Sequence, residues 1–104
     1  MKYTKLMMDV YNALGLGSEK ARTRKELCAA LGCNDRERRE AIEALRWDYP
    51  IVTNDDGTGY YIPTPDSRGR VEASMWLSRQ NKRQKSIKRA TRGARLFVVQ
   101  RQEG

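Results

Sequence analysis

The side chains most able to do chemistry in this sequence are its 21 lysines and arginines, which are unevenly distributed. Residues 1–65 contain ten Lys/Arg and ten Asp/Glu, and these charges cancel. Residues 66–104 contain eleven Lys/Arg and three Asp/Glu, so they account for the whole net charge of +8. Such an asymmetry indicates a polyanionic partner for the basic part of the chain.

The basic segment has the spacing of an amphipathic helix. Asp66 or Ser67 can cap it and no proline follows, so the sequence predicts a helix over about residues 67–92, with Gly93 as an early end. At 100° per residue, one side is apolar and carries Trp76, Ile87, Ala90 and Ala94. The opposite side carries the cations Lys82, Lys85, Lys88, Arg89, Arg92 and Arg95.

A row of cations without nearby acids suits contacts to phosphates, which position a protein on nucleic acid without reading its sequence. We therefore predict that these six side chains bind nucleic acid. A solvated helix whose apolar side pairs two subunits is an alternative, and the two interpretations are compatible. No membrane partner is expected, because the apolar side is mostly alanine and no stretch of about 18 apolar residues occurs.

The segment Leu96-Phe97-Val98-Val99 is a short apolar tail, either extended or the last turn of the helix. A chain this polar should not leave four apolar residues in water, so we expect the tail to dock on the preceding domain or on a second copy. A homodimer is the expected assembly. The predicted dimer or docking face consists of Trp76, Ile87, Ala90, Leu96 and Phe97.

Enzymatic functions fit the composition poorly. The chain has no histidine, the usual general base, and its adjacent carboxylates Asp55 and Asp56 are explained by an Asn-Asp-Asp-Gly turn. Cys28 and Cys33 cannot by themselves complete a four-ligand zinc site and are expected to be reduced thiols. We predict a cytoplasmic, non-enzymatic protein with no metal, cofactor or small-molecule substrate, since the N-terminus has no signal-peptide core.

Residues 23–47 have the pattern of two capped helices around a short turn. Thr23 with Glu26, and Asn34 with Glu37, have the spacing of capping boxes, and each precedes a run of apolar residues at helical spacing. Gly32 between them is a typical helix stop. This arrangement predicts a helix-turn-helix.

The flanking segments extend this unit. Residues 3–14 predict a packing helix, and the third helix, from residue 34 to about 47, should end before Pro50. Residues 51–53 and 60–62 then predict a β-hairpin around an Asp-Gly turn. We therefore expect a mainly α fold with a small β-hairpin: a winged helix-turn-helix domain over residues 1–65, followed by a basic helix and apolar tail over residues 66–104.

The run DRERREAIEALRWDYPIVTNDDGTGYYI resembles the recognition helix and wing of phage and prophage winged-helix proteins, and is similar to the N-terminal DNA-binding domain of the biotin repressor. The resemblance covers roughly residues 1–65 and departs at Arg38, where the family usually has an apolar residue. An arginine there is expected to extend its head to solvent or to rotate the helix slightly. The matching residues are Asp35, Arg36, Arg39, Ile42, Leu45, Arg46, Pro50, Ile51, Gly59, Tyr60 and Tyr61.

The resemblance implies a double-stranded-DNA-binding protein of a bacterial host cell, either a transcription regulator or a replication or recombination accessory. In that family the edge before the second helix faces the phosphates, and the N-terminal part of the third helix faces the bases. On this sequence those positions are Arg22, Thr23, Arg24 and Lys25, and Asn34, Arg36 and Arg39.

One feature favours a different partner. Residues 35–48 contain five acids and four arginines, and Asp55 and Asp56 stand at the tip of the predicted wing. Such surfaces suit a protein better than phosphates. The alternative function is therefore a winged helix used for protein binding, such as a phage anti-defence (anti-CRISPR-like) inhibitor of a nucleic-acid-processing complex.

Overall fold

Side-chain caps start the first three helices of the structure, a computed structural model that describes residues 3–103. Thr4 caps α1 (Lys5–Ala13), Thr23 caps α2 (Arg24–Leu31) and Asn34 caps α3 (Asp35–Leu45). Both predicted capping boxes are confirmed, with Glu26 and Glu37 as the reciprocal partners. The helices themselves are one or two residues shorter at some ends than predicted, and at the N-terminal ends this is because the capping residues lie outside the helical geometry.

The turn between α2 and α3 depends on Gly32. Its φ of 63° is left-handed, as predicted for a helix stop at this position. The chain then needs only Cys33 and Asn34 before α3 begins. This short connection holds α2 and α3 against each other.

The core lies where α1, α2 and α3 meet. Its buried residues come from all three helices and from the segment that follows α3, and they are Val10, Leu14, Leu27, Ala41, Ile42, Leu45 and Ile51. At the edge of this core the Tyr11 and Tyr49 rings lie 4.5 Å apart, and the Tyr3 and Tyr49 rings 5.9 Å apart. The hydroxyl of Tyr3 also donates a hydrogen bond to Asp48. These contacts join the end of α3 to α1.

The sheet is larger than the predicted hairpin. The hairpin of β3 (Val52–Thr53) and β4 (Gly59–Ile62) is antiparallel, with Val52 opposite Tyr61. Two further strands pair with β4: β1 (Gly15–Leu16) is parallel to its C-terminal half, and β2 (Arg22–Thr23) is antiparallel to its N-terminal half. A 3-10 helix, η1 (Ser18–Lys20), connects them. The sequence did not predict β1 and β2, which have only two residues each and form only through pairing with β4.

The last element, α4, extends from Ser67 to Glu103. The carboxylate of Asp66 accepts the backbone N–H of Gly69 at 2.9 Å, so Asp66 is the predicted N-terminal cap. The predicted end near residue 92 is wrong: Gly93 lies within the helix, and the apolar tail is helical as well. A glycine lowers helix propensity by only about 1 kcal/mol, which does not force a stop without a competing turn.

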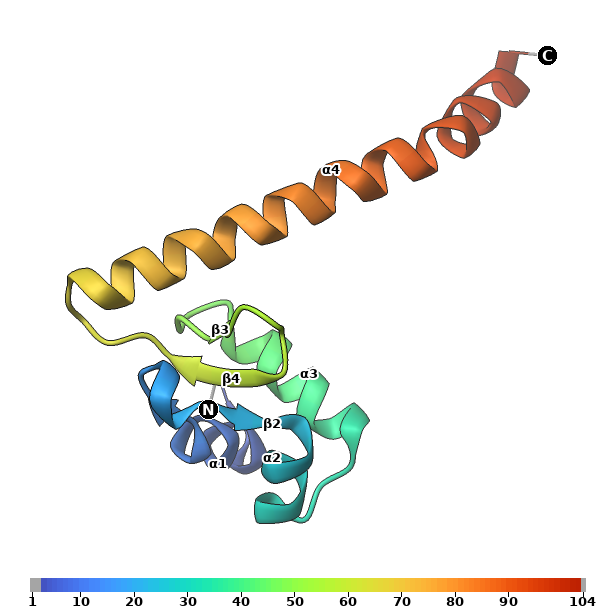
Figure 1. Ribbon diagram of the computed structural model, residues 1–104. Helices are drawn as coiled ribbons and strands as arrows, with labels where there is room; N and C mark the ends of the chain where they lie inside the picture. The colour runs from blue at the N-terminus through green and yellow to red at the C-terminus, as the bar shows by residue number, and fades with distance from the viewer. Residues whose placement is uncertain (1–2, 104) are drawn as a thin grey trace.

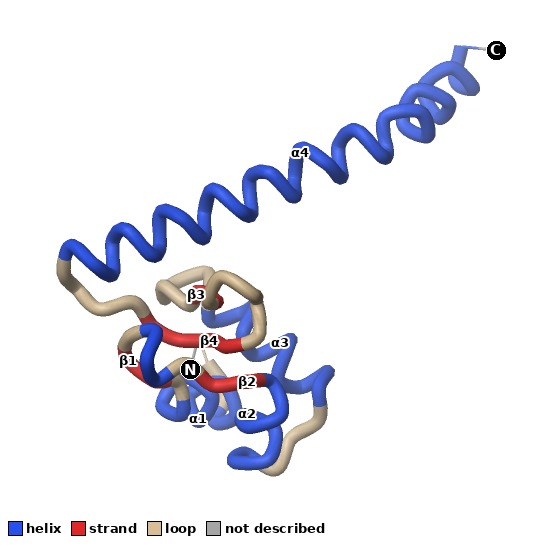
Figure 2. The backbone as a smooth tube through the Cα atoms, viewed as in Figure 1, coloured by secondary structure: helices blue, strands red, loops and turns tan. Residues whose placement is uncertain are grey.

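The first part of α4 packs beside the β3–β4 hairpin, and the second part projects away from the rest of the chain (Figure 1). In Figure 2 the strands lie between α1 and α2 on one side and α4 on the other. Among residues 3–103, no helix combines the length and the apolar character that crossing a bilayer requires. The overall structure is therefore mostly helical, with a small mixed sheet and a long C-terminal helix.

Candidate nucleic-acid interface

The largest uniform patch of charge is on the second part of α4. We call residues 81–99 the projecting arm, because every side chain in this range is exposed. The arm contains seven cations and no acid: Lys82, Arg83, Lys85, Lys88, Arg89, Arg92 and Arg95. In an α-helix all of these except Arg83 fall within an arc of about 140°. The six cations predicted to contact phosphates thus share one exposed face.

These cations repel one another. Lys85 and Arg89, and Lys88 and Arg92, are four residues apart, a spacing at which like charges destabilise a helix. Arg95 folds back along the helix, where its guanidinium donates to the hydroxyl of Thr91 and, at 2.9 Å, to the carbonyl of Lys88. A polyanion lying along this face would relieve the repulsion and gain several charge-assisted hydrogen bonds.

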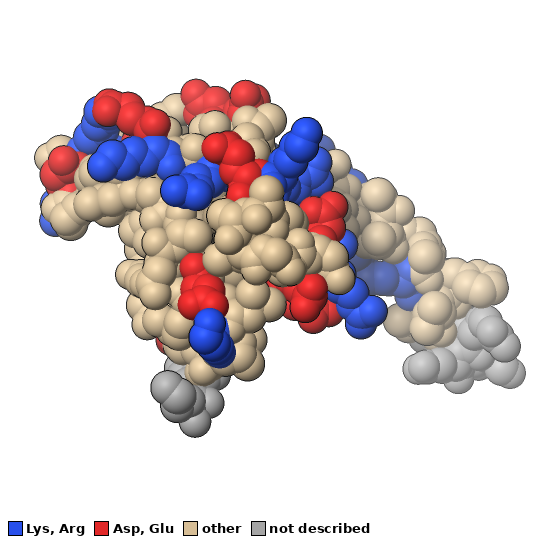
Figure 3. Space-filling view, turned by 90° about the horizontal axis from the view of Figure 1, so that it is seen from below, with Lys and Arg blue, Asp and Glu red and all other residues tan. Residues whose placement is uncertain are grey.

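The remainder of the molecule has a mixed surface. In the view from below, Lys/Arg and Asp/Glu side chains are interspersed over the globular part (Figure 3). The exposed cations Arg22, Arg24 and Lys25 do lie together at the start of α2, as predicted. Thr23 between them is the helix cap: its hydroxyl accepts the N–H of Glu26 at 3.1 Å. This cluster is a smaller candidate for phosphate contact.

The exposed face of α3 is close to neutral. Arg36, Glu40, Glu43 and Trp47 follow one another at helical spacing, and Arg36 forms a 3.0 Å ion pair with Glu40. Arg39 is exposed beside this row. With Arg39 included, this face carries two arginines and two glutamates, so its charges cancel and leave little attraction for phosphates.

Trp47 is 86 % exposed, and the sequence interpretation treated it only as the end of a helix. The spacing of residues 36, 40, 43 and 47 was the signal that could have placed it on the outer face. An indole this exposed at the end of a mixed-charge row is a candidate contact for a partner.

Asn34 caps α3, and this role competes with its predicted contact to a base. Its side-chain oxygen accepts the N–H of Glu37 at 2.8 Å, which completes the α3 cap. A bidentate contact to adenine needs both the oxygen and the amide nitrogen of an asparagine. In this structure Asn34 therefore acts as a cap rather than as a presented base reader.

Two other arginines, Arg38 of α3 and Arg46 directly after it, point inward. Arg38 is 4 % exposed, so the first of its two predicted alternatives, extension of its head to solvent, is wrong. Its guanidinium donates to the hydroxyl of Tyr60 at 3.2 Å and lies 5.6 Å from the centre of that ring. The fold accommodates the charge in this position because an aromatic face and a hydroxyl from β4, together with the Asp35 carboxylate 3.7 Å from Nε, replace water.

Arg46 continues this stack toward α4. Its guanidinium lies 5.8 Å from the Tyr60 ring and 5.0 Å from the Trp76 ring, and its Nε donates to the carbonyl of Ile51 at 3.1 Å. Burial lowers the pKa of Arg46 from its ordinary value. Trp76, predicted for the dimer or docking face, thus docks on its own chain. The stack connects α3, the sheet and α4, and so sets the direction of the projecting arm.

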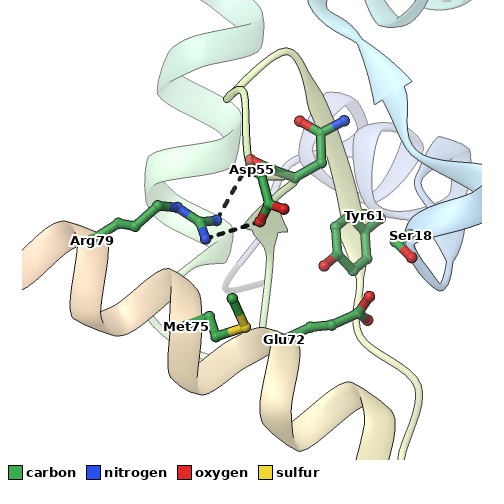
Figure 4. Close-up of a pocket in the computed structure, with 7 residues that line it drawn as sticks. Ser18, Asp55, Tyr61, Glu72, Met75 and Arg79 are labelled. Carbon is green, nitrogen blue, oxygen red and sulfur yellow. Dashed lines mark hydrogen bonds and ion pairs between the residues drawn. The ribbon is translucent and has the colours of Figure 1, made fainter.

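Arg79 makes the second link between α4 and the hairpin. Its guanidinium donates to the carboxylate of Asp55 at 3.3 Å and to the carbonyl of Thr53 at 3.0 Å. Figure 4 shows the contact between Arg79 and Asp55. Beside it, α4, the hairpin and η1 enclose a pocket of about 260 Å³. Arg79 of α4 therefore pairs with Asp55, one carboxylate of the acidic hairpin tip, and its guanidinium is engaged within the fold.

The pocket itself offers little chemistry. It is lined by Ser18, Asn54, Asp55, Tyr61, Glu72, Met75 and Arg79. Burial raises the pKa of Tyr61, and the neighbouring Glu72 carboxylate raises it further, so this phenol stays protonated at neutral pH. The pocket lies next to the α4 contacts and is best explained as part of that packing.

The two cysteines lie near each other at the end of α2. Burial raises the pKa of the Cys33 thiol, and the neighbouring Cys28 raises it further. The thiol of Cys28 donates to Asp35 at 3.7 Å. A thiol with a raised pKa is a poor nucleophile at neutral pH, so Cys33 is not activated for nucleophilic chemistry.

Comparison of the chain with protein-family models, curated proteins and solved structures gave no match.

Proposed function

We propose that this protein is a small winged helix-turn-helix protein that binds double-stranded DNA, with the projecting arm as its main phosphate contact. The observation that carries the proposal is the charge of the arm: seven exposed cations and no acid within residues 81–99. Its role would be that of a phage-type transcription regulator or an accessory in replication or recombination.

The winged-helix part of the proposal is supported by the order and contacts of the elements. Two capped helices meet across a left-handed glycine, α1 packs against α3, and the β3–β4 hairpin follows α3 directly. In such a fold α3 is the recognition helix and the hairpin is the wing. With Asp56 at its exposed tip, this wing is poorly suited to enter a minor groove.

In this proposal the arm provides most of the affinity for DNA, and α3 sets the orientation of the protein on it. The arm supplies salt-sensitive attraction that is independent of base sequence, and Arg36 and Arg39 on α3 supply the limited base contact. The exposed cations at the start of α2 add phosphate contacts near the recognition helix. Arg38, Arg46 and Arg79 contribute none, since their guanidinium groups are engaged within the fold.

The test is the salt dependence of binding to a short DNA duplex. If about seven phosphates are neutralised, the logarithm of the affinity should fall with the logarithm of salt concentration with a slope of about −6. The double variant K85Q/R89Q should make that slope less steep by about 2. Its matched control K5Q/R70Q removes the same charge outside the arm and should leave the slope unchanged.

Two results would contradict the proposal. One is no binding of a duplex at about 50 mM salt, where phosphate contacts are strong. The other is an equal loss of slope in K85Q/R89Q and K5Q/R70Q, which would mean that only the net charge matters.

A second candidate is a protein-binding role for the α3 face. The row Arg36, Glu40, Glu43 and Trp47 favours it, because with the adjacent Arg39 its charges balance and its tryptophan is exposed. Under this proposal the protein would act on a nucleic-acid-processing complex, as an anti-defence inhibitor does. Trp47→Ala should then abolish capture of the partner while DNA binding by the arm persists. Loss of DNA binding with an intact partner complex would exclude this role for the α3 face.

A further inference from the structure

The projecting arm has an apolar side that nothing in the described part of the chain covers. This side consists of Ile87, Ala90, Ala94 and Phe97, which we call the seam. Ile87 is 56 % exposed and Phe97 is 61 % exposed. The spacing of the four residues is three, four and three, which is the repeat by which two helices pack against each other.

Six of the seven cations of the arm lie away from this side, and the seventh, Arg83, lies at the N-terminal end of the seam line, four residues before Ile87. The positions that border the seam are neutral and mostly small: Gln84, Ser86, Thr91 and Gly93. In a two-helix packing, these positions lie closest to the partner after the seam itself. The six cations Lys82, Lys85, Lys88, Arg89, Arg92 and Arg95 all fall on the far side.

An isolated arm would be a poor helix. It has no acid to form stabilising pairs with its cations, and a helix of this length without tertiary contacts is marginal in water. Nucleic acid on the cationic face would not cover Ile87 or Phe97, which lie on the opposite side. A helix partner is therefore needed for the seam in addition to any polyanion.

We infer that the seam binds the seam of a second copy of this chain, with the two arms antiparallel. The fold gives the first reason for this direction. The seam lies on the same side of α4 as Trp76, and that side is covered by the globular part of its own chain up to Gln80. A parallel partner helix would run into that globular part along the whole docked half of α4, whereas an antiparallel one centred on Ala90 reaches Gln80 only at its residue 100.

The side chains give the second reason. A parallel, in-register pair would set Arg83 against Arg83 and Phe97 against Phe97. An antiparallel pair centred on Ala90 sets Ile87 against Ala94, which matches a large residue with a small one. The same register sets Arg83 over Phe97 of the other copy, a favourable cation–π contact. In this dimer the cationic faces point outward from a central rod, and the globular parts lie at its two ends.

The dimer does not depend on the proposed DNA binding, and the effect of added salt distinguishes dimerisation from DNA binding. Without DNA, added salt should strengthen the dimer, because it screens the repulsion between seven cations on each arm. The same salt should weaken DNA binding. A protein that dimerises but ignores DNA would refute only the proposed function.

Sedimentation velocity of the full-length protein over a range of concentrations and salt tests the dimer itself. Ala90→Lys places two like charges face to face at the centre of the seam and should yield a monomer. Ser78→Lys adds the same charge on an exposed part of α4 outside the seam and should leave the dimer intact. A wild-type protein that stays monomeric throughout, or a dimer that Ala90→Lys leaves unchanged, overturns the inference.

Disulfide trapping in a C28S/C33S background tests the direction, since a disulfide forms only where Cβ atoms come within about 4.5 Å. A mixture of the Ile87→Cys and Ala94→Cys variants should cross-link, and Ile87→Cys alone should not. Self-linking of Ile87→Cys without linking in the mixture would indicate a parallel pair and overturn the antiparallel arrangement.

Discussion

At the scale of single residues, the same side chain has two different tasks in this protein. Arg38, Arg46 and Arg79 bind tyrosine, tryptophan, carbonyl and carboxylate groups within the fold. The arginines of the projecting arm are exposed. A count of charges therefore overstates the attraction of these arginines for an anion, because their guanidinium groups are already occupied.

Asp66 leads to a prediction about acid stability. The hydroxyl of Thr64 at 2.6 Å and the N–H of Gly69 at 2.9 Å both donate to this carboxylate and hold its pKa below the ordinary value of 3.8. A lowered folded-state pKa means that the stabilisation is present above pH 3.8 and is lost as the pH falls through the folded value. Asp66→Asn keeps a capping oxygen but does not titrate.

We expect wild type to have a higher melting temperature than Asp66→Asn at pH 7, and the difference to shrink as the pH falls below 3.8. Thermal melts of both proteins from pH 7 downward measure this difference in melting temperature. The other carboxylates are the same in both proteins, so their titration affects both melts. A difference that stays constant with pH would show that the charge on Asp66 does not stabilise the cap.

At the scale of elements, α4 combines two parts with different surroundings. Its docked part is tied down by Asp66, Trp76 and Arg79 against the hairpin. The described residues of its projecting arm have only the hydrogen bonds within the helix itself and the contacts that a partner would add. Gly69 lies in the docked part and Gly93 in the projecting arm, so substitutions at these two glycines compare the two parts of α4.

Gly69→Ala and Gly93→Ala should have opposite effects. A Cβ at Gly69 would overlap the backbone of Thr64, so the helix would have to shift, and we expect a loss of about 1–3 kcal/mol. A Cβ at Gly93 meets nothing within 4 Å, so alanine there should favour helix by up to about 1 kcal/mol. Urea unfolding measures the first effect and far-ultraviolet circular dichroism the second. Equal effects would mean that the docked part is not closely packed.

At the scale of the whole molecule, the arm lies outside the region of long-range packing. The molecule measures 54 Å along its longest axis and 31 and 26 Å along the others, because the arm extends well beyond the globular part. Local opening is easiest where few contacts restrain the backbone. The arm is thus the part of the structure whose order depends most on partners.

We predict that the amides of residues 81–99 exchange quickly at concentrations where the chain is monomeric, while those of α3 are protected. Adding duplex DNA, or raising the protein concentration, should slow exchange in the arm and change α3 much less. Hydrogen–deuterium exchange with mass spectrometry resolves the two segments. Protection of the arm equal to that of α3 in the free monomer would contradict this prediction.

The sequence by itself determined the features that arise from neighbouring residues. Thr23, Gly32 and Asn34 mark the ends of α2 and α3, and the Asp-Gly turn marks the hairpin, because caps and turns are made by residues within four positions of each other. The cationic and apolar sides of the arm follow in the same way from helical periodicity.

The tertiary structure decided what depends on residues far apart in the chain. Strands β1 and β2 exist because β4 supplies their partners, and Arg38 is buried because Tyr60 receives its guanidinium. Trp76 docks on its own chain because Arg46 lies beneath it. No local pattern encodes these contacts, since their energy appears only when packing has brought the partners together and removed the water between them.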